Sequence, residues 1–237
     1  MYKRVFSYPL MLAVVVSSVS LLAAAAADAS VSQTIFDLED QPLTGALAGD
    51  DPGALTSLTL TQPELSMTIT RPGDPNQFDV YDLNDNDFDI PFPTYWGERS
   101  ISPWFSNDGT AYVADFSKPV QSVLIDMGDF GGDADNLFIE AYSGPNASGT
   151  LLDSMITQLP GGGSTWTGAT LSVATTNPQI NSIRFMGGDD DYEVPGFGFT
   201  LEVPNSVYYD NFSVVVPEPS SLALFAGLAA FALRRRR

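Results

Sequence analysis

The stretch VQSVLIDM, from Val120 to Met127, is the clearest indication of the fold. Val123, Ile125 and Met127 alternate with other side chains, so an extended chain turns all three to one face. This period of two is typical of a β-strand that covers a hydrophobic core on one side. The segment NLFIEAY, Asn136–Tyr142, repeats the pattern with Leu137, Ile139 and Ala141.

Eight further short segments resemble strands, and Gly, Pro, Asn and Asp fill the intervals between them. They are Ser57–Thr61, Leu65–Thr70, Ala111–Phe116, Leu151–Ile156, Ala169–Val173, Ile180–Met186, Phe197–Val203 and Val207–Val216. No part of the body has helical periodicity for more than two turns. The pattern predicts an all-β fold, a single antiparallel β-sandwich or jelly roll over residues 30–215. Leu83–Ile101 is the least regular part, for which we expect a long surface loop or an insertion of low order.

The charge of the chain excludes several classes of partner. The formal net charge is −19, and only four of the ten basic residues lie between the two ends. Binding of nucleic acid requires Lys and Arg to neutralise phosphates, so we expect no nucleic-acid partner. Divalent cations are plausible partners. The chain has no cysteine and no histidine, which excludes thiolate metal sites and Ser-His-Asp or Cys-His catalysis.

The N-terminal segment, residues 1–29, is typical of a secretory signal peptide. Lys3 and Arg4 precede an apolar stretch that is densest over Leu10–Ala27, and small residues follow it. Both Ala25–Ala27 and Ala27–Ala29 fit a small-residue cleavage site. We therefore predict a signal helix and export, with a permanent membrane anchor as the alternative.

The C-terminal segment, residues 216–237, has a different organisation. Pro217, Glu218 and Pro219 precede Ser221–Leu233, an uncharged run of 13 residues. As a helix this run is roughly 20 Å long, whereas the hydrocarbon core of a bilayer is about 30 Å thick. Its apolar side chains nevertheless cover all sides, and the cluster Arg234, Arg235, Arg236 and Arg237 follows the positive-inside rule. We predict a short transmembrane helix in a precursor inserted transiently in the inner membrane, with an amphipathic or buried terminal helix as the alternative.

The order Pro-Glu-Pro, short hydrophobic run and terminal arginines resembles the PEP-CTERM protein-sorting signal of bacteria. The resemblance covers only about the last 22 residues. It implies processing by an exosortase-type membrane enzyme, in or near Pro217-Glu218-Pro219. It also implies a final location at the cell surface or in the extracellular matrix, and it implies no activity.

The body resembles the galactose-binding-like jelly rolls of bacterial exported proteins. The resemblance rests on Ile35–Asp40 at the start, Lys118–Asp133 with the NLFIEAY segment in the middle, and Val207–Val214 at the end. In such modules the first and last strands are neighbours and often share a structural calcium ion. The matching positions here are Asp37 or Glu39 and Asp210. A carboxylate partly buried between strands needs a counterion, so we expect a calcium site there, with an exposed aspartate as the alternative.

Other acidic and aromatic groups are weaker candidates for binding sites. Asp82–Asp89 fails as an EF-hand loop, because Asp87 and Pro93 stand where Gly and Glu are required. Asp126, Asp129, Asp133 and Asp135 surround a glycine-rich turn and fit either a metal or sugar site or a polar loop. Tyr95, Trp96 and Trp104 flank the irregular region and are candidates to stack on sugar rings, as is Trp166, with core packing as the alternative.

Three functions remain open from the sequence. The first is a non-catalytic component of the cell surface or extracellular matrix. The second is a module that binds extracellular polysaccharide. The third, with the least support, is a hydrolase that uses a pair of carboxylates.

Overall fold

The structure is a computed structural model. The described residues are 31–44, 55–72, 78–83, 96–102, 110–129, 134–160, 166–177, 179–188, 192–193, 200–201 and 207–217. The chain divides into two compact units, of which one is Gln33–Val216 and the other combines Met1–Ser32 with Pro217–Arg237. The predicted signal helix and C-terminal helix lie outside the described residues and stay predictions.

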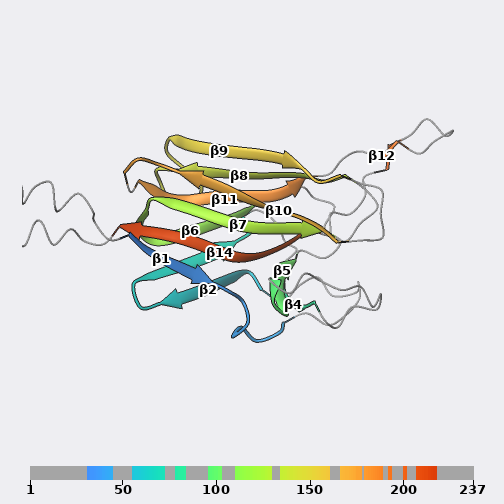
Figure 1. Cartoon of the computed structure of the whole chain (residues 1–237), viewed down its shortest axis with the longest axis horizontal. Helices are drawn as coiled ribbons and strands as arrows, with labels where there is room; N and C mark the ends of the chain where they lie inside the picture. The colour runs from blue at the N-terminus through green and yellow to red at the C-terminus, as the bar shows by residue number, and fades with distance from the viewer. Residues whose placement is uncertain are drawn as a thin grey trace, which may run out of the picture. The chain divides into compact units, whose positions relative to one another are not determined.

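The body consists of two six-stranded sheets that form a sandwich (Figure 1). We call them the β7 sheet and the β8 sheet. The β7 sheet has the order β10-β7-β14-β5-β4, and β1 also pairs with β14. Its strands are β1 (Val31–Phe36), β4 (Asp79–Asp82), β5 (Arg99–Ser102), β7 (Ser122–Asp129), β10 (Thr167–Ala174) and β14 (Tyr208–Pro217).

The β8 sheet has the order β2-β3-β6-β11-β8-β9. Its strands are β2 (Ser57–Gln62), β3 (Leu65–Thr70), β6 (Tyr112–Val120), β8 (Asn136–Tyr142), β9 (Leu151–Gln158) and β11 (Ile180–Gly188). A separate pair joins β12 (Tyr192–Glu193) to β13 (Thr200–Leu201). Neighbouring strands of the β8 sheet run antiparallel throughout, so the predicted antiparallel sandwich is confirmed.

Alternation along the strands explains why the two sheets face each other. The apolar residues of β7 at positions 123, 125 and 127 are fully buried, as are those of β8 at positions 137, 139 and 141. Their intervening neighbours are only half-buried. A one-residue slip in pairing would turn each apolar set to solvent, so burial specifies the register.

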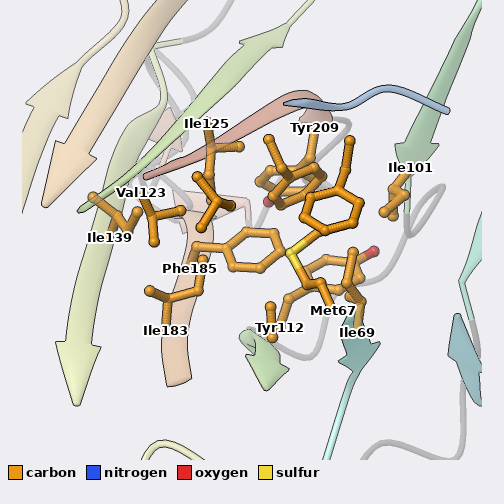
Figure 2. Close-up of a cluster of buried hydrophobic side chains, with 14 of the residues drawn as sticks. Met67, Ile69, Ile101, Tyr112, Val123, Ile125, Ile139, Ile183, Phe185 and Tyr209 are labelled. Atoms are coloured by element: carbon orange, nitrogen blue, oxygen red, sulfur yellow. The ribbon is translucent and has the colours of Figure 1, made fainter. Parts of the chain in front are cut away.

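Aromatic rings fill the middle of the sandwich (Figure 2). Tyr112 from β6 stacks on Phe185 from β11 at 5.3 Å between ring centroids. Tyr209 from β14 meets Phe185 edge-on at 5.2 Å, and its hydroxyl accepts a hydrogen bond of 2.7 Å from the backbone N–H of Gly187. Ile101 from β5 and Met67 from β3 belong to the same cluster (Figure 2), so both sheets contribute to one core.

The irregular region differs from the expectation at both of its ends. Arg99–Ser102 is strand β5, and Leu83 and Ile101 are completely buried. These positions therefore belong to the fold rather than to a surface loop. The short strands β4 and β5 escaped sequence analysis because four residues are too few to show a period. Residues 84–95 lie outside the described residues.

Candidate metal centre

A β-bulge in β14 places Asp210 beside β7. Asp210 and Asp126 are register partners, and the register shifts between Asp210 and Ser213. Asn211 occupies the extra position with a φ of 50°, which is the left-handed region that Asn tolerates. Because the bulge adds one residue, Tyr209 and Phe212 both enter the core. Asp210 lies on the same face of the sheet as Asp126.

The carboxylate of Asp210 is buried without compensation. Only 1% of the residue is exposed, and neither carboxylate oxygen has a hydrogen-bond partner. The pKa of Asp210 is raised to about 8, chiefly by burial, and the negative charges of Glu39, Asp126 and Asp37 contribute to the rise. The nearby backbone N–H of Asn211 lowers this pKa. A buried carboxylate surrounded by three others calls for either a proton or a cation.

The start of β5 holds Glu39 in place. Glu39 Oε1 accepts hydrogen bonds from the backbone N–H groups of Glu98 at 2.7 Å and Arg99 at 3.1 Å. Gly97 has a φ of +72°, and a Cβ added there would lie 2.1 Å from Glu39 Oε1. Only glycine therefore allows this approach. The guanidinium of Arg99 donates to the backbone carbonyl of Gln41.

Asp126 is also fixed by neighbours on two strands. Its Oδ1 accepts a hydrogen bond of 2.5 Å from the hydroxyl of Thr170 on β10. Its Oδ2 accepts a bond of 3.1 Å from the side-chain amide of Asn211. Asn211 thus connects the bulge in β14 to the carboxylate of Asp126 on β7.

The predicted site residues therefore come together. Asp37 and Glu39 lie close enough to Asp210 for their charges to act on it, and the structure adds Asp126 to the set. We call these four residues the acidic cluster. Carboxylate oxygens are the ligands that Ca²⁺ prefers, so the residue types suit that ion. As placed, however, no three acidic side chains in the described ranges converge tightly enough to hold a metal ion.

Sequence analysis assigned Asp126 to a different group, the one around the glycine-rich turn. The structure separates that group. Asp129 and Asp135 are 2% and 3% exposed, so neither belongs to an exposed polar loop, and Asp133 lies outside the described residues. The cross-strand partnership of Asp126 with Asp210 depends on pairing between β7 and β14, for which the sequence holds no local signal.

The prediction that Trp96 stacks on a sugar ring is wrong. Only 1% of it is exposed, and its ring packs edge-on against Trp166 at 4.7 Å. Trp166 in turn lies 5.8 Å from the ring of Tyr208. These side chains form a second small core with Tyr81 and Leu83, so Trp96 has no free face for a sugar. Tyr95 and Trp104 lie outside the described residues.

The predicted sorting motif lies almost wholly beyond the described residues. Pro217 ends β14, whereas Glu218, Pro219 and Arg234 to Arg237 are not described. In the described ranges there is no helix long and apolar enough to cross a membrane. The hydrophobic run Ser221–Leu233 is not among those ranges, so its predicted membrane insertion stays a prediction.

The body of the protein is a two-sheet antiparallel β-sandwich that carries an acidic cluster. The C-terminal segment indicates how this body is sorted. Residues 215–237 match the PEP-CTERM protein-sorting motif, which confirms the resemblance found in the sequence. The motif supports an exported protein that is sorted to the cell surface after processing by an exosortase-type enzyme. Among curated proteins, none matches the chain in sequence.

Two adhesin domains of Lys-gingipain are among the solved structures to which this chain shows some likeness. The K2 cleaved adhesin domain has 10% identity and a TM-score of 0.45, over 77% of this chain and 97% of that one. The K1 cleaved adhesin domain, from Porphyromonas gingivalis, has 9% identity and a TM-score of 0.39, over 78% and 98%. A DUF4465 family protein from Bacteroides ovatus has 10% identity and a TM-score of 0.27, over 78% and 99%. At these values the likeness says nothing about activity.

Proposed function

We propose that the protein is a non-catalytic component of the bacterial cell surface or extracellular matrix, whose β-sandwich is stabilised by a divalent cation, Ca²⁺, at the acidic cluster. One observation carries the proposal. Asp210 is buried, lacks hydrogen-bond partners for both carboxylate oxygens, and lies beside three further carboxylates. Calcium would bind Asp210 directly, with Asp37 and Glu39 as the further ligands and Asp126 beside them.

The surroundings of Asp37 and Glu39 favour the binding of a cation over a role limited to hydrogen bonds within the protein. Asp37 is exposed, and hydrogen bonds from the backbone hold only one oxygen of Glu39, which leaves its second oxygen for an ion. Binding would require these side chains to move closer to one another than they are placed in the structure. A cation would also reduce the mutual repulsion in a body that has few basic residues.

The exposure of the aromatic residues favours a structural role over polysaccharide binding. In the described strands of the two sheets, and at Phe78, Trp96 and Trp166 beside them, every aromatic side chain is buried or half-buried. A sugar-binding sheet face usually needs exposed rings. Because this sandwich shows none at those positions, the proposal does not include a carbohydrate ligand.

The proposal includes the route to the surface. Ser221–Leu233 would insert the precursor transiently in the inner membrane, with Arg234–Arg237 on the cytoplasmic side. Exosortase-type processing near Pro217-Glu218-Pro219 would then release the body for display. Deletion of residues 217–237 should release the protein into the medium or misplace it, as measured by cell fractionation. Unchanged retention at the surface would contradict this route.

The calcium site is tested by thermal unfolding of a fragment that spans residues 30–216. Addition of Ca²⁺ should raise the melting temperature, and EDTA should lower it. A ligand present at 100 times its Kd stabilises a protein by about 2.7 kcal/mol. Asp210→Asn should remove the response, whereas Asp153→Asn, a change of the same kind on β9, should keep it. Equal responses in both variants would contradict the site.

A further inference from the structure

The open edges of the two sheets differ in how they are protected. An edge strand has backbone N–H and C=O groups that can pair with a strand of another chain, and proteins usually protect such edges. On the β10 edge, the backbone N–H of Ala174 donates to Asp153 Oδ2 at 2.8 Å, and that of Ser172 reaches the sulfur of Met155 at 3.4 Å. Side chains of β9 thus cover the edge of β10.

The edges at β4 and β2 are short or polar, whereas β1, which pairs with β14, carries among its described side chains a single exposed large apolar one, Ile35. β4 has only four residues, and Thr44 covers it through bonds to the backbone of Val80: Thr44 N–H donates to the Val80 carbonyl at 3.2 Å, and Val80 N–H donates to Thr44 Oγ1 at 3.1 Å. The exposed side chains of β2 are all polar, namely Ser57, Thr59, Thr61 and Gln62. These edges therefore offer little to an apolar partner.

β9 has none of these protections. It ends the β8 sheet and pairs only with β8 among the described strands (Figure 1). Three of the five large apolar side chains that are exposed in the described residues lie on it, with exposures of 49% for Leu151, 37% for Met155 and 75% for Ile156. Over its eight residues there is no Lys, Arg or Pro.

The single charge on β9 does not protect the free edge. Asp153 Oδ1 accepts a hydrogen bond of 2.9 Å from Ser154 N–H, and Oδ2 accepts the bond from β10. Both oxygens are thus occupied on the inner side of the strand. Ser154 and Ile156, which lie on the outer face opposite Glu140 and Phe138, are exposed.

We propose that β9 is an interaction surface for a second copy of this chain, which adds its own β9 antiparallel to the first and joins two β8 sheets into one continuous sheet. An antiparallel strand edge is complementary to itself about a two-fold axis, so one segment supplies both sides of a closed dimer. Ile156 of each copy then packs on the outer face of the joined sheet.

Charge favours a copy of this chain over a basic partner. The chain has a net charge of −19, so a basic protein would be attracted to its acidic surfaces rather than to the nearly uncharged β9. Two copies repel each other over most of their surface, and this edge is where that repulsion is small. Sorting to a surface, as the tail motif supports, confines the copies and raises their effective concentration.

The absence of cysteine from the chain permits a direct test in the full-length protein, in the bacterium that sorts it. Opposite residues of an antiparallel pair have Cα atoms about 4.5–5.5 Å apart, which is within disulfide range. Because only the residue on the two-fold axis opposes its own copy, at least one of three samples should form disulfide-linked dimers under mild oxidation: Ser154→Cys alone, Ile156→Cys alone, or a mixture of the two variants. The dimer yield of that sample should exceed at least tenfold that of Thr59→Cys and Thr61→Cys on β2, the opposite edge of the same sheet.

A charge on β9 supplies the second measurement. Ile156→Lys, added to Ser154→Cys, should reduce the dimer yield by at least tenfold, because a lysine on an edge strand opposes pairing of that strand with another chain. Thr61→Lys added to Ser154→Cys should leave it unchanged. Since Ile156 is 75% exposed, its replacement leaves the core intact. Equal yields at β9 and β2, no dimer at either, or a β9 thiol linked to a different protein would each overturn the proposal.

Discussion

Asp210 should make the stability of the sandwich depend on pH. In the folded protein its pKa is about 8, against a usual value of 3.8. Between these pH values the folded protein holds one proton more than the unfolded chain, so the free energy of unfolding falls as pH rises. The stabilising effect of the neutral carboxyl is complete below about pH 4 and lost above about pH 8.

The magnitude follows from the same two values. Each pH unit between them corresponds to about 1.4 kcal/mol for a single proton, so the total decrease is on the order of 5 kcal/mol in the absence of metal. Asp210→Asn replaces the carboxyl with a neutral amide of the same shape. It should remove this part of the pH dependence and, in EDTA at pH 8, make the protein more stable than the wild type.

The assay is urea unfolding of residues 30–216, followed by the fluorescence of the buried Trp96 and half-buried Trp166, at several pH values in EDTA. Repulsion within the acidic surface lowers the stability of both proteins as pH rises, so the difference between wild type and Asp210→Asn isolates Asp210. Parallel curves for the two proteins between pH 4 and pH 8 would refute the reasoning.

Calcium should reverse the trend for the wild type alone. The ion binds the deprotonated carboxylate, so below pH 8 it must displace the proton from Asp210. The apparent affinity should therefore rise about tenfold per pH unit as pH approaches 8. A calcium response that does not change with pH would exclude Asp210 as a ligand, even if calcium binds elsewhere.

Three substitutions test how the surroundings are built, each by urea unfolding. Gly97→Ala should destabilise by about 1–3 kcal/mol, because its Cβ meets Glu39 Oε1 at a positive φ; adding Glu39→Ala should recover part of the loss, and no recovery would exclude that contact as the cause. Trp96→Ala should cost about 3–5 kcal/mol as a buried aromatic, and a cost below about 1 kcal/mol would mean that its ring is exposed in solution. Tyr209→Phe should cost about 1–3 kcal/mol, because the N–H of Gly187 loses its acceptor, and a neutral effect would show that water replaces the hydroxyl.

Much of the architecture could be predicted because alternation is a local property. The bounds Leu65–Thr70 and Asn136–Tyr142 agree with the strands β3 and β8 of the structure. The C-terminal sorting motif could also be predicted, because Pro-Glu-Pro, the hydrophobic run and the terminal arginines all lie within 22 consecutive residues. In both cases the information is contained in near neighbours along the chain.

The candidate site was only partly predictable. Asp37, Glu39 and Asp210 came from the expectation that the first and last strands are neighbours, and the structure brings these residues together. The partnership of Asp126 with Asp210 was not predicted, because it depends on pairing between β7 and β14. For Trp96 the alternative of core packing holds, because burial depends on what packs over a residue from distant parts of the chain.

The sequence by itself determined the class of fold, the sorting motif and the shortage of basic residues, since composition and short-range order suffice for each. Only the tertiary structure decided that both carboxylate oxygens of Asp210 are buried without a hydrogen-bond partner, that Gly97 lies against Glu39, and that β9 ends its sheet among the described strands. These properties arise from pairing between segments far apart in sequence. Because the cost of a buried charge and the exposure of a strand edge depend on surroundings, they exist only in the folded chain.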